Sequence, residues 1–198
     1  MKAFNFLNQN NNLINYYFFD KNFTNEEIEK IIEITRKYQV VDGKVNAIVD
    51  YDYRNSKVSW LPLNEETNFI YEKLVNLLKI ANKEMWNFTI TDIVDSLQFA
   101  EYNDISENGK NGFFDWHIDI GSNNNMSTRK ISVIVQLTEP TEYEGGDLEF
   151  MMGRSTTKAP KEKGTVIFFP SYILHKVNNV TKGTRKSLVL WFHGPPFV

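Results

Sequence analysis

The chain has 198 residues, of which 41% are hydrophobic and 14% aromatic, a composition typical of a folded protein rather than a disordered one. Its 22 basic residues nearly balance 25 acidic residues and leave a net charge of -3, so charge gives no reason to expect a nucleic-acid partner. The absence of cysteine excludes disulfides, zinc–thiolate sites, iron–sulfur clusters and cysteine nucleophiles.

The N-terminal stretch 1–12 is too polar for the apolar region of a signal peptide, because Asn5, Asn8 and Gln9 interrupt it. No apolar run approaches the roughly 18 residues that a membrane-spanning helix needs. We therefore expect a cytoplasmic protein without a membrane partner, folded as a single domain over residues 1–198.

The first part of the chain, residues 1–93, is predicted to be a helical support region. Thr24 and Glu27 have the spacing of a capping box, and the apolar residues that follow at helical spacing predict a helix over 25–38. A second helix is expected over 65–86, with its buried side formed by Leu74, Leu77, Leu78, Ala81 and Met85. One or two short strands are expected between the helices, within 45–60.

The hydrophobic period changes from about residue 94, where short β-rich runs alternate with polar or glycine-containing turns. The predicted strands are Val94–Tyr102, Phe113–Ile120, Lys130–Leu137, Asp147–Met151, Thr165–Phe169, His175–Val180 and Arg185–His193. Many short strands without intervening helices are typical of an antiparallel sandwich or barrel. The sequence thus predicts an α+β, mainly β fold, in which a jelly-roll core over 94–193 is backed by the N-terminal helices.

One short segment points to metal chemistry. Side chains alternate along a strand, so His117 and Asp119 are expected on the same face, where an imidazole and a carboxylate can share a metal ion. The chain has only three histidines, so a third ligand of this kind comes from His175 or His193. Two imidazoles and one carboxylate leave one side of a metal open, as in Fe(II) oxygenases, although zinc accepts the same donors.

A second signal is the position of Arg185, ten residues after His175. Antiparallel neighbours joined by a short turn are expected to bring Arg185 beside His175 inside the barrel. A buried arginine needs an anion, because an unpaired buried charge is costly, and its guanidinium matches a carboxylate in bidentate fashion. Ser187 lies on the same face and is expected to donate a second hydrogen bond.

Several motifs in this order resemble the prolyl-4-hydroxylase-like 2-oxoglutarate/Fe(II) oxygenases, and the resemblance is strongest to the PKHD-type hydroxylases of bacteria and phages. The motifs are Leu97–Tyr102, the His117 and Asp119 pair, Arg129–Leu137, Tyr143–Leu148, Phe169–Ser171 before His175, and Arg185–Val189. Residues 94–193 carry most of the likeness, whereas Arg54–Ser56 and Trp60 fit more loosely.

The resemblance implies a double-stranded β-helix with Fe(II) held by His117, Asp119 and His175. It further implies that 2-oxoglutarate and O2 fill the open positions on the metal, with Arg185 anchoring 2-oxoglutarate and Tyr102 and Gln136 as polar neighbours. Ascorbate is expected to support such an enzyme. Halogenating relatives have a small residue in place of the carboxylate of Asp119, so its presence favours hydroxylation.

These observations leave several functions open. The first is a dioxygenase that hydroxylates an unactivated C–H bond, either in a prolyl residue of a protein or peptide or in a free amino acid. The others are a jelly roll that binds 2-oxoglutarate or metal without turnover, and a cupin-like Zn or Mn enzyme, which has no evident need for Arg185. His193 is interpreted as a structural histidine. The loops 103–112 and 121–129 are expected to border the substrate mouth.

Overall fold

A computed structural model describes residues 16–45, 48–122 and 124–197; the stretch 1–12 considered above lies outside them. The two α-helices are α1 (Asn25–Thr35) and α2 (Asn68–Met85), and two short 3₁₀ helices, η1 (Asn124–Thr128) and η2 (Pro140–Glu142), occur in loops. The Thr24 hydroxyl accepts the backbone N–H of Glu27, and the Glu27 carboxylate accepts that of Thr24. This confirms the capping box and fixes the start of α1.

The larger sheet is antiparallel. In order across the sheet, its strands are β1 (Tyr17–Phe19), β11 (Val166–Pro170), β7 (Arg129–Gln136), β13 (Val180–His193), β5 (Leu97–Asn103), β4 (Lys57–Leu61) and β2 (Val41–Asp42), and β8 (Tyr143–Gly145) pairs with β13 beside this path. The central strands β7 and β13 are rich in β-branched residues, which suit a pleated sheet buried on both faces.

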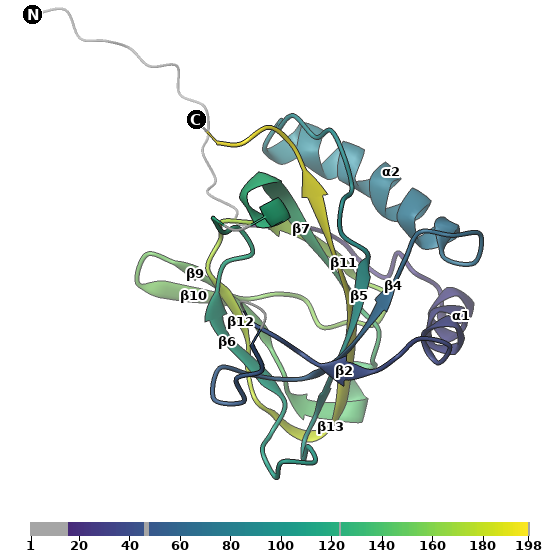
Figure 1. Cartoon of the computed structure of the whole chain (residues 1–198), viewed down its shortest axis with the longest axis vertical. Helices are drawn as coiled ribbons and strands as arrows, with labels where there is room; N and C mark the ends of the chain where they lie inside the picture. Colours follow the sequence, from purple (N-terminus) through teal and green to yellow (C-terminus); the bar gives the residue numbers. More distant parts are fainter. Residues whose placement is uncertain (1–15, 46–47, 123, 198) are drawn as a thin grey trace, which may run out of the picture.

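The smaller sheet lies opposite the larger one (Figure 1). Its strands, in order, are β10 (Ser155–Lys158), β9 (Leu148–Met152), β12 (His175–Val177), β6 (Phe113–His117) and β3 (Arg54–Asn55). Two facing antiparallel sheets form the jelly roll, and the layer between them contains buried side chains from both, among them Phe150, Phe169 and Ile134.

The two α-helices pack on the outer face of the larger sheet, away from the smaller sheet (Figure 1). Ile31 of α1 and Leu74 of α2 share one apolar cluster with Val133 of β7 and Leu190 of β13. Because the helices seal this face, side chains on the opposite face of the same strands point into the barrel. The helical backing therefore leaves the space between the two sheets free for a functional site.

The structure confirms the mainly β jelly-roll fold with its helical backing, and it refines several boundaries. The helices predicted over 25–38 and 65–86 span Asn25–Thr35 and Asn68–Met85. The N-terminal region also contributes strands, since β1, β2 and β4 extend the larger sheet and β3 the smaller one. β13 runs without a break from Val180 to His193, and it begins before the predicted start at Arg185.

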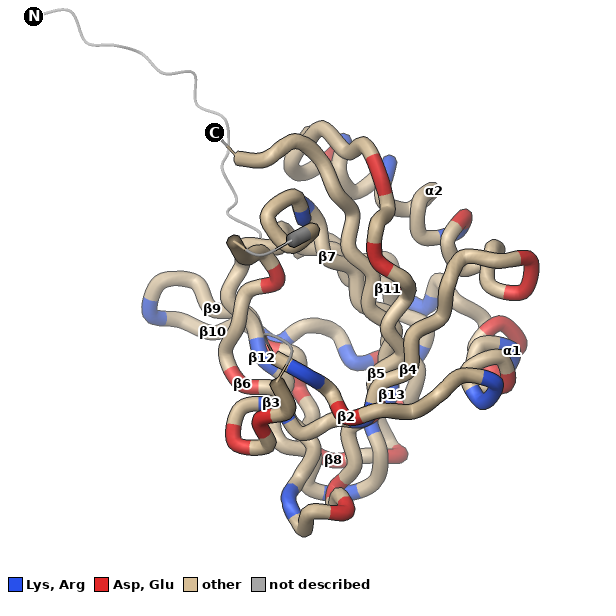
Figure 2. Tube along the Cα trace, viewed as in Figure 1, with Lys and Arg blue, Asp and Glu red and all other residues tan. Residues whose placement is uncertain are grey.

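None of the helices in the described part of the chain is long and apolar enough to cross a membrane. Acidic and basic residues are interspersed along the trace in the view of Figure 2. This distribution accords with the nearly balanced composition.

Candidate functional site

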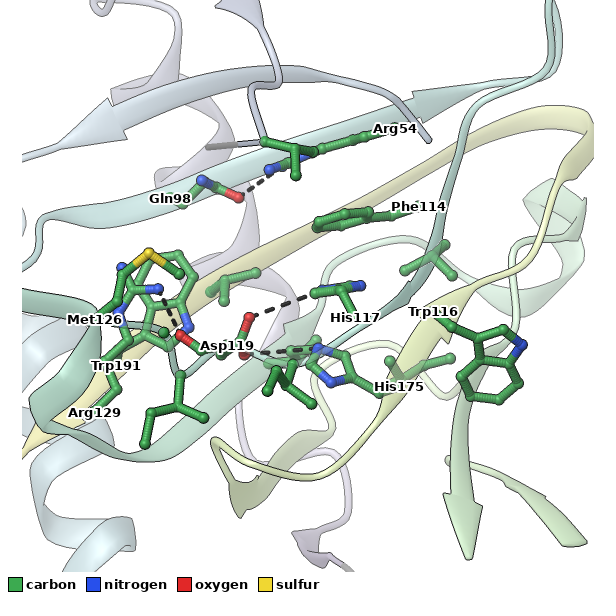
Figure 3. Close-up of a pocket in the computed structure, with 18 of the residues that line it drawn as sticks. Arg54, Gln98, Phe114, Trp116, His117, Asp119, Met126, Arg129, His175 and Trp191 are labelled. Atoms are coloured by element: carbon green, nitrogen blue, oxygen red, sulfur yellow. Dashed lines mark hydrogen bonds and ion pairs between the residues drawn. The ribbon is translucent and has the colours of Figure 1, made fainter. Parts of the chain in front are cut away.

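The structure brings His117, Asp119 and His175 together between the two sheets, where their side chains face one another (Figure 3). His117 ends β6, and His175 begins β12 directly opposite it in the antiparallel register. Asp119 lies just beyond the strand that was predicted to contain it. Its backbone N–H donates to the Ser171 carbonyl at 2.8 Å, which keeps the segment extended and turns Ile118 outward, 44% exposed.

The three side chains have the geometry of a metal site. His117 Nε2 lies 3.8 Å from Asp119 Oδ1, and His175 Nε2 lies 3.6 Å from Asp119 Oδ2. Each Nδ1 is within hydrogen-bond distance of a backbone carbonyl: that of His117 with Asp115 at 2.7 Å and that of His175 with Ile173 at 2.8 Å. Such bonds fix both rings with Nε2 toward the shared centre, as ligand histidines require.

The electrostatics of the cluster favour ligand-competent protonation states. Burial, together with the nearby His175, lowers the pKa of His117 to about 3, so its imidazole is neutral near pH 7. Burial acts to raise the pKa of Asp119, but the two histidines, Ser132 and Arg129 outweigh it, and the pKa lies below its usual value. A neutral imidazole and an ionised carboxylate are the forms that bind a metal ion.

A set of neighbours holds the Asp119 carboxylate and backbone. Ser132 of β7 donates a hydrogen bond of 2.6 Å to Asp119 Oδ2 and lies 3.0 Å from the Ser171 hydroxyl. Arg129 Nη1 donates to the Asp119 carbonyl at 3.2 Å. Both serines lie within motifs noted in the sequence, but only the fold shows that they contact Asp119.

Arg185 is 1% exposed and faces the same pocket from β13. Its Nη2 donates to Gln136 Oε1 at 3.0 Å, and its Nη1 lies 3.4 Å from the Ser187 hydroxyl. Its Nε has no hydrogen-bond partner, and no carboxylate among the described residues forms an ion pair with it. A buried guanidinium with an unsatisfied N–H and no counter-ion fits a carboxylate ligand.

The expected route from His175 to Arg185 is wrong in one respect. β12 and β13 are not paired neighbours: β12 pairs with β6 and β9, whereas β13 pairs with β5, β7 and β8. The chain crosses from the smaller to the larger sheet between the two strands, so Arg185 and His175 belong to opposite walls of the barrel. Both residues nevertheless line one pocket.

The other predicted co-substrate residues surround Arg185. The Tyr102 ring lies 5.4 Å from the Arg185 guanidinium carbon, and Tyr102 and Ser187 both line the pocket. Gln136 supports the arginine, since its Nε2 donates to the Pro160 carbonyl at 3.0 Å while its Oε1 accepts from Arg185. The sequence placed Tyr143 in a motif but assigned it no role. Burial raises the pKa of its hydroxyl, although the nearby Arg185 acts to lower it.

The pocket has a volume of about 740 Å³. Gly121, Ser122 and Met126 of the predicted mouth loop 121–129 line it, as expected. The loop 103–112 does not line it. Asn55 instead binds this loop through the backbone carbonyls of Lys110 and Asn111, so the expectation for 103–112 is wrong.

The third histidine belongs to a network that Arg129 links to the Asp119 backbone. His193 Nε2 lies 3.0 Å from Asp95 Oδ2, and its Nδ1 lies 2.9 Å from the Thr128 hydroxyl. Asp95 also pairs with Arg129 at 2.9 Å, and the Arg129 guanidinium stacks on Trp191. With both ring nitrogens engaged, His193 is a satisfied structural histidine, as predicted.

Comparisons with known proteins agree with this geometry. The family model described as the 2OG-Fe(II) oxygenase superfamily matches residues 97–193. A PKHD-type hydroxylase of Picosynechococcus sp. is 30% identical over 173 residues, which cover 85% of this chain and 73% of that protein. A PKHD-type hydroxylase of Prochlorococcus marinus is 32% identical over 140 residues, 70% of this chain and 55% of that protein.

Two solved structures share the fold. A Pseudomonas putida prolyl-4-hydroxylase has a TM-score of 0.71 at 18% identity, covering 91% of this chain and 93% of that one. A Trichoplax adhaerens prolyl hydroxylase, in complex with a hypoxia inducible factor peptide fragment, has a TM-score of 0.73 at 18% identity, covering 93% and 84%. The aligned parts span about half the length of the first curated relatives. By its matched motifs, its fold and its similarity to these relatives, the chain belongs to the 2OG-Fe(II) oxygenase superfamily and groups with the PKHD-type hydroxylases.

Proposed function

We propose that the protein is a dioxygenase that uses Fe(II), 2-oxoglutarate and O2 to hydroxylate an unactivated C–H bond, in a prolyl residue of a protein or peptide. The observation that carries the proposal is the combination of two features in one pocket. His117, Asp119 and His175 offer three ligand atoms within 4.8 Å of one another, and Arg185 offers a buried cation that has no counter-ion among the described residues.

The residues of the cluster fit the Fe(II) ion that the family implies. Nitrogen and oxygen donors in a set of two histidines and one carboxylate are the ligands of non-haem Fe(II) oxygenases. When bound there, the iron with its co-substrate supplies the oxidising chemistry. The protein holds the donors in their metal-binding protonation states and presents them in the wall of the pocket.

Arg185 and its neighbours perform the second task of the site. Its guanidinium binds the distal carboxylate of 2-oxoglutarate, with Ser187 as a further donor and the Tyr102 ring beside it. Gln136 fixes the guanidinium, because its side chain is itself held by the Pro160 carbonyl. A pre-positioned cation lowers the ordering cost of binding a flexible dicarboxylate.

The prolyl substrate is proposed from the relatives, since both solved neighbours are prolyl hydroxylases and one of them binds a peptide fragment. A free amino acid is the second candidate. Ascorbate is proposed as a supporting reductant, and the cytoplasm as the location.

Succinate release tests the function. Purified protein with Fe(II), ascorbate and 2-oxoglutarate is assayed against proline-containing peptides and free amino acids, and substrate-dependent succinate is expected. Asp119→Ala and His175→Ala are each expected to abolish it, because the metal needs all three ligands. A protein that binds 2-oxoglutarate and metal but never releases succinate would instead be the non-catalytic jelly roll.

An anaerobic titration separates the iron enzyme from a cupin-like Zn or Mn enzyme. Fe(II) added to the protein with 2-oxoglutarate is expected to produce a visible charge-transfer band. Arg185→Ala should require more 2-oxoglutarate to produce the same band. A titration that remains colourless at saturating 2-oxoglutarate would contradict the proposed iron site.

A further inference from the structure

A second arginine, Arg54, lies in the wall of the same pocket and has no part in the functions assigned so far. Arg54 belongs to β3 and is 6% exposed. Its guanidinium carbon lies 4.6 Å from the centre of the Phe114 ring, and that ring stacks on His117 with 3.4 Å between ring centres. The arginine is thus separated from a predicted metal ligand by one aromatic ring (Figure 3).

The hydrogen bonds of Arg54 use only some of its N–H donors, and they do not neutralise its positive charge. Nε donates to the Ser56 hydroxyl at 2.8 Å, Nη2 to Gln98 Oε1 at 2.9 Å, and Nη1 reaches the Lys44 carbonyl at 3.4 Å. All three acceptors are neutral, and among the described residues no carboxylate forms an ion pair with Arg54. A guanidinium has five N–H donors, so two of them are left for a ligand.

The balance of charges around the pocket indicates that a ligand beside Arg54 must be negatively charged. Arg129 is neutralised by Asp95. Once Fe(II) and the 2-oxoglutarate dianion are bound, their charges cancel, and those of Asp119 and Arg185 cancel as well. Arg54 then remains as a buried cation without a counter-ion, and its contact with Phe114 offsets only a small part of the cost of burying a charge.

In the described part of the chain, the contacts of Arg54 and those of Arg185 involve different residues. Arg185 contacts Tyr102, Gln136 and Ser187, whereas Arg54 contacts Ser56, Gln98 and Phe114. A single dicarboxylate held by Arg185 therefore does not explain Arg54.

The wall near Arg54 offers a further unused donor. Gln98 lies opposite Trp60 in the sheet register, and the Trp60 ring lies 6.3 Å from that of Trp191. Trp191 lines the pocket, and its buried Nε1 has no hydrogen-bond partner in the described part of the chain. Excess donors and an unbalanced cation favour a ligand rich in acceptors and negatively charged.

We propose that the substrate of this enzyme carries a carboxylate group that pairs with Arg54 while the C–H bond to be hydroxylated lies near the metal ligands. The inference rests on the proposed function and refines its substrate class. The carboxylate is the α-carboxylate of a free amino acid, the C-terminus of a peptide or an acidic side chain beside the reacting residue. Arg54 is a specificity-determining residue in each case.

Binding of matched acid and amide probes tests this proposal. The pairs are L-proline and L-prolinamide, acetyl-glycyl-proline and its C-terminal amide, and acetyl-aspartyl-prolyl-glycinamide and its asparaginyl counterpart. A fourth pair, L-leucine and L-leucinamide, contains no proline. The protein is first saturated with Mn(II) and 2-oxoglutarate, so that Arg185 is already occupied. Binding is followed by intrinsic fluorescence, because three of the four tryptophans, Trp60, Trp116 and Trp191, line the pocket.

The acid of at least one pair is expected to bind the wild type about tenfold more tightly than its amide, as a charge-assisted contact implies. The pair that shows the preference identifies the source of the carboxylate. Arg54→Gln should remove the preference, and Arg54→Lys should retain part of it. Lys44→Gln, which removes an exposed cation at the same pocket but keeps the backbone carbonyl, should leave it unchanged.

Equal binding of acid and amide in all four pairs would overturn the proposal, as would a preference that survives in Arg54→Gln. The affinity for 2-oxoglutarate and the melting temperature, measured on each variant, show that the pocket is still folded. A preference confined to the leucine pair would uphold the role of Arg54 and sink the prolyl substrate. Loss of 2-oxoglutarate binding in the wild type itself would sink the proposed function instead.

Discussion

The Ser132 hydroxyl donates a 2.6 Å hydrogen bond to the Asp119 carboxylate, although the two residues come from different sheets of the barrel. Ser132 belongs to β7 in the larger sheet, and Asp119 follows β6 of the smaller one. The bond ties the ligand cluster to β7, which is buried along its whole length. A fully buried strand in the middle of the larger sheet therefore orients the Asp119 carboxylate.

Replacing Ser132 by alanine should weaken metal binding. The bond helps to keep the pKa of Asp119 low and fixes the orientation of its carboxylate, and loss of such a contact typically costs about 10- to 100-fold in metal affinity. Anaerobic titration with Co(II) measures the effect. Ser155→Ala, on the exposed strand β10, is the matched control and should bind Co(II) as the wild type does.

Replacing Arg185 by alanine should chiefly raise the 2-oxoglutarate requirement. Two or more charge-assisted hydrogen bonds are lost, each of about 1.5–3 kcal/mol, which corresponds to an increase in KM of roughly 100-fold or more. Arg185→Lys should recover part of the affinity, because lysine restores the positive charge but cannot form the bidentate hydrogen bonds of a guanidinium. Arg154→Ala removes an exposed arginine and should leave KM unchanged. An unaltered KM in Arg185→Ala would refute the anchor assignment.

The metal-free protein should lose stability as the pH falls below about 6.5. His117 has a pKa of about 3 in the folded protein, against an ordinary value of 6.5. Between these values the unfolded chain binds a proton that the folded protein excludes, so protonation favours unfolding. Urea midpoints of chelator-treated protein at pH 7.5, 6.0 and 5.0 should fall, and the fall should be smaller in His117→Gln. An equal fall of the urea midpoint with pH in the two proteins would show that the folded protein does not lower the pKa of His117.

Replacing Asn55 by alanine should release the loop between β5 and β6. The Asn55 side chain is buried and donates to the carbonyls of Lys110 and Asn111 at 3.0 and 2.8 Å, and both carbonyls would lose this donor. We expect a loss of about 1–3 kcal/mol in unfolding free energy and faster hydrogen exchange over residues 104–112. Asn76→Ala on the exposed side of α2 should change stability by less than about 0.5 kcal/mol. Unchanged exchange in the loop would contradict the anchoring role.

Local signals in the sequence predicted much of the fold. The capping pair Thr24 and Glu27 is present in the structure, and the alternating runs became the strands of the barrel. The pairing of the strands could not be predicted as well from the sequence, because the partners of a strand depend on contacts with residues far away along the chain. His175 and Arg185 were expected on adjacent strands, but they line one pocket from strands of different sheets.

The sequence by itself determined the chemistry that this protein can hold. Three histidines, no cysteine and the spacing of His117 and Asp119 limited the possible metal donors, because ligand type is a property of residue identity. Only the tertiary structure decided which side chains face the pocket with their charge unbalanced. Nothing in the sequence around Arg54 shows that its guanidinium lacks a carboxylate partner, since that depends on which residues the folded barrel places within a few ångströms of it.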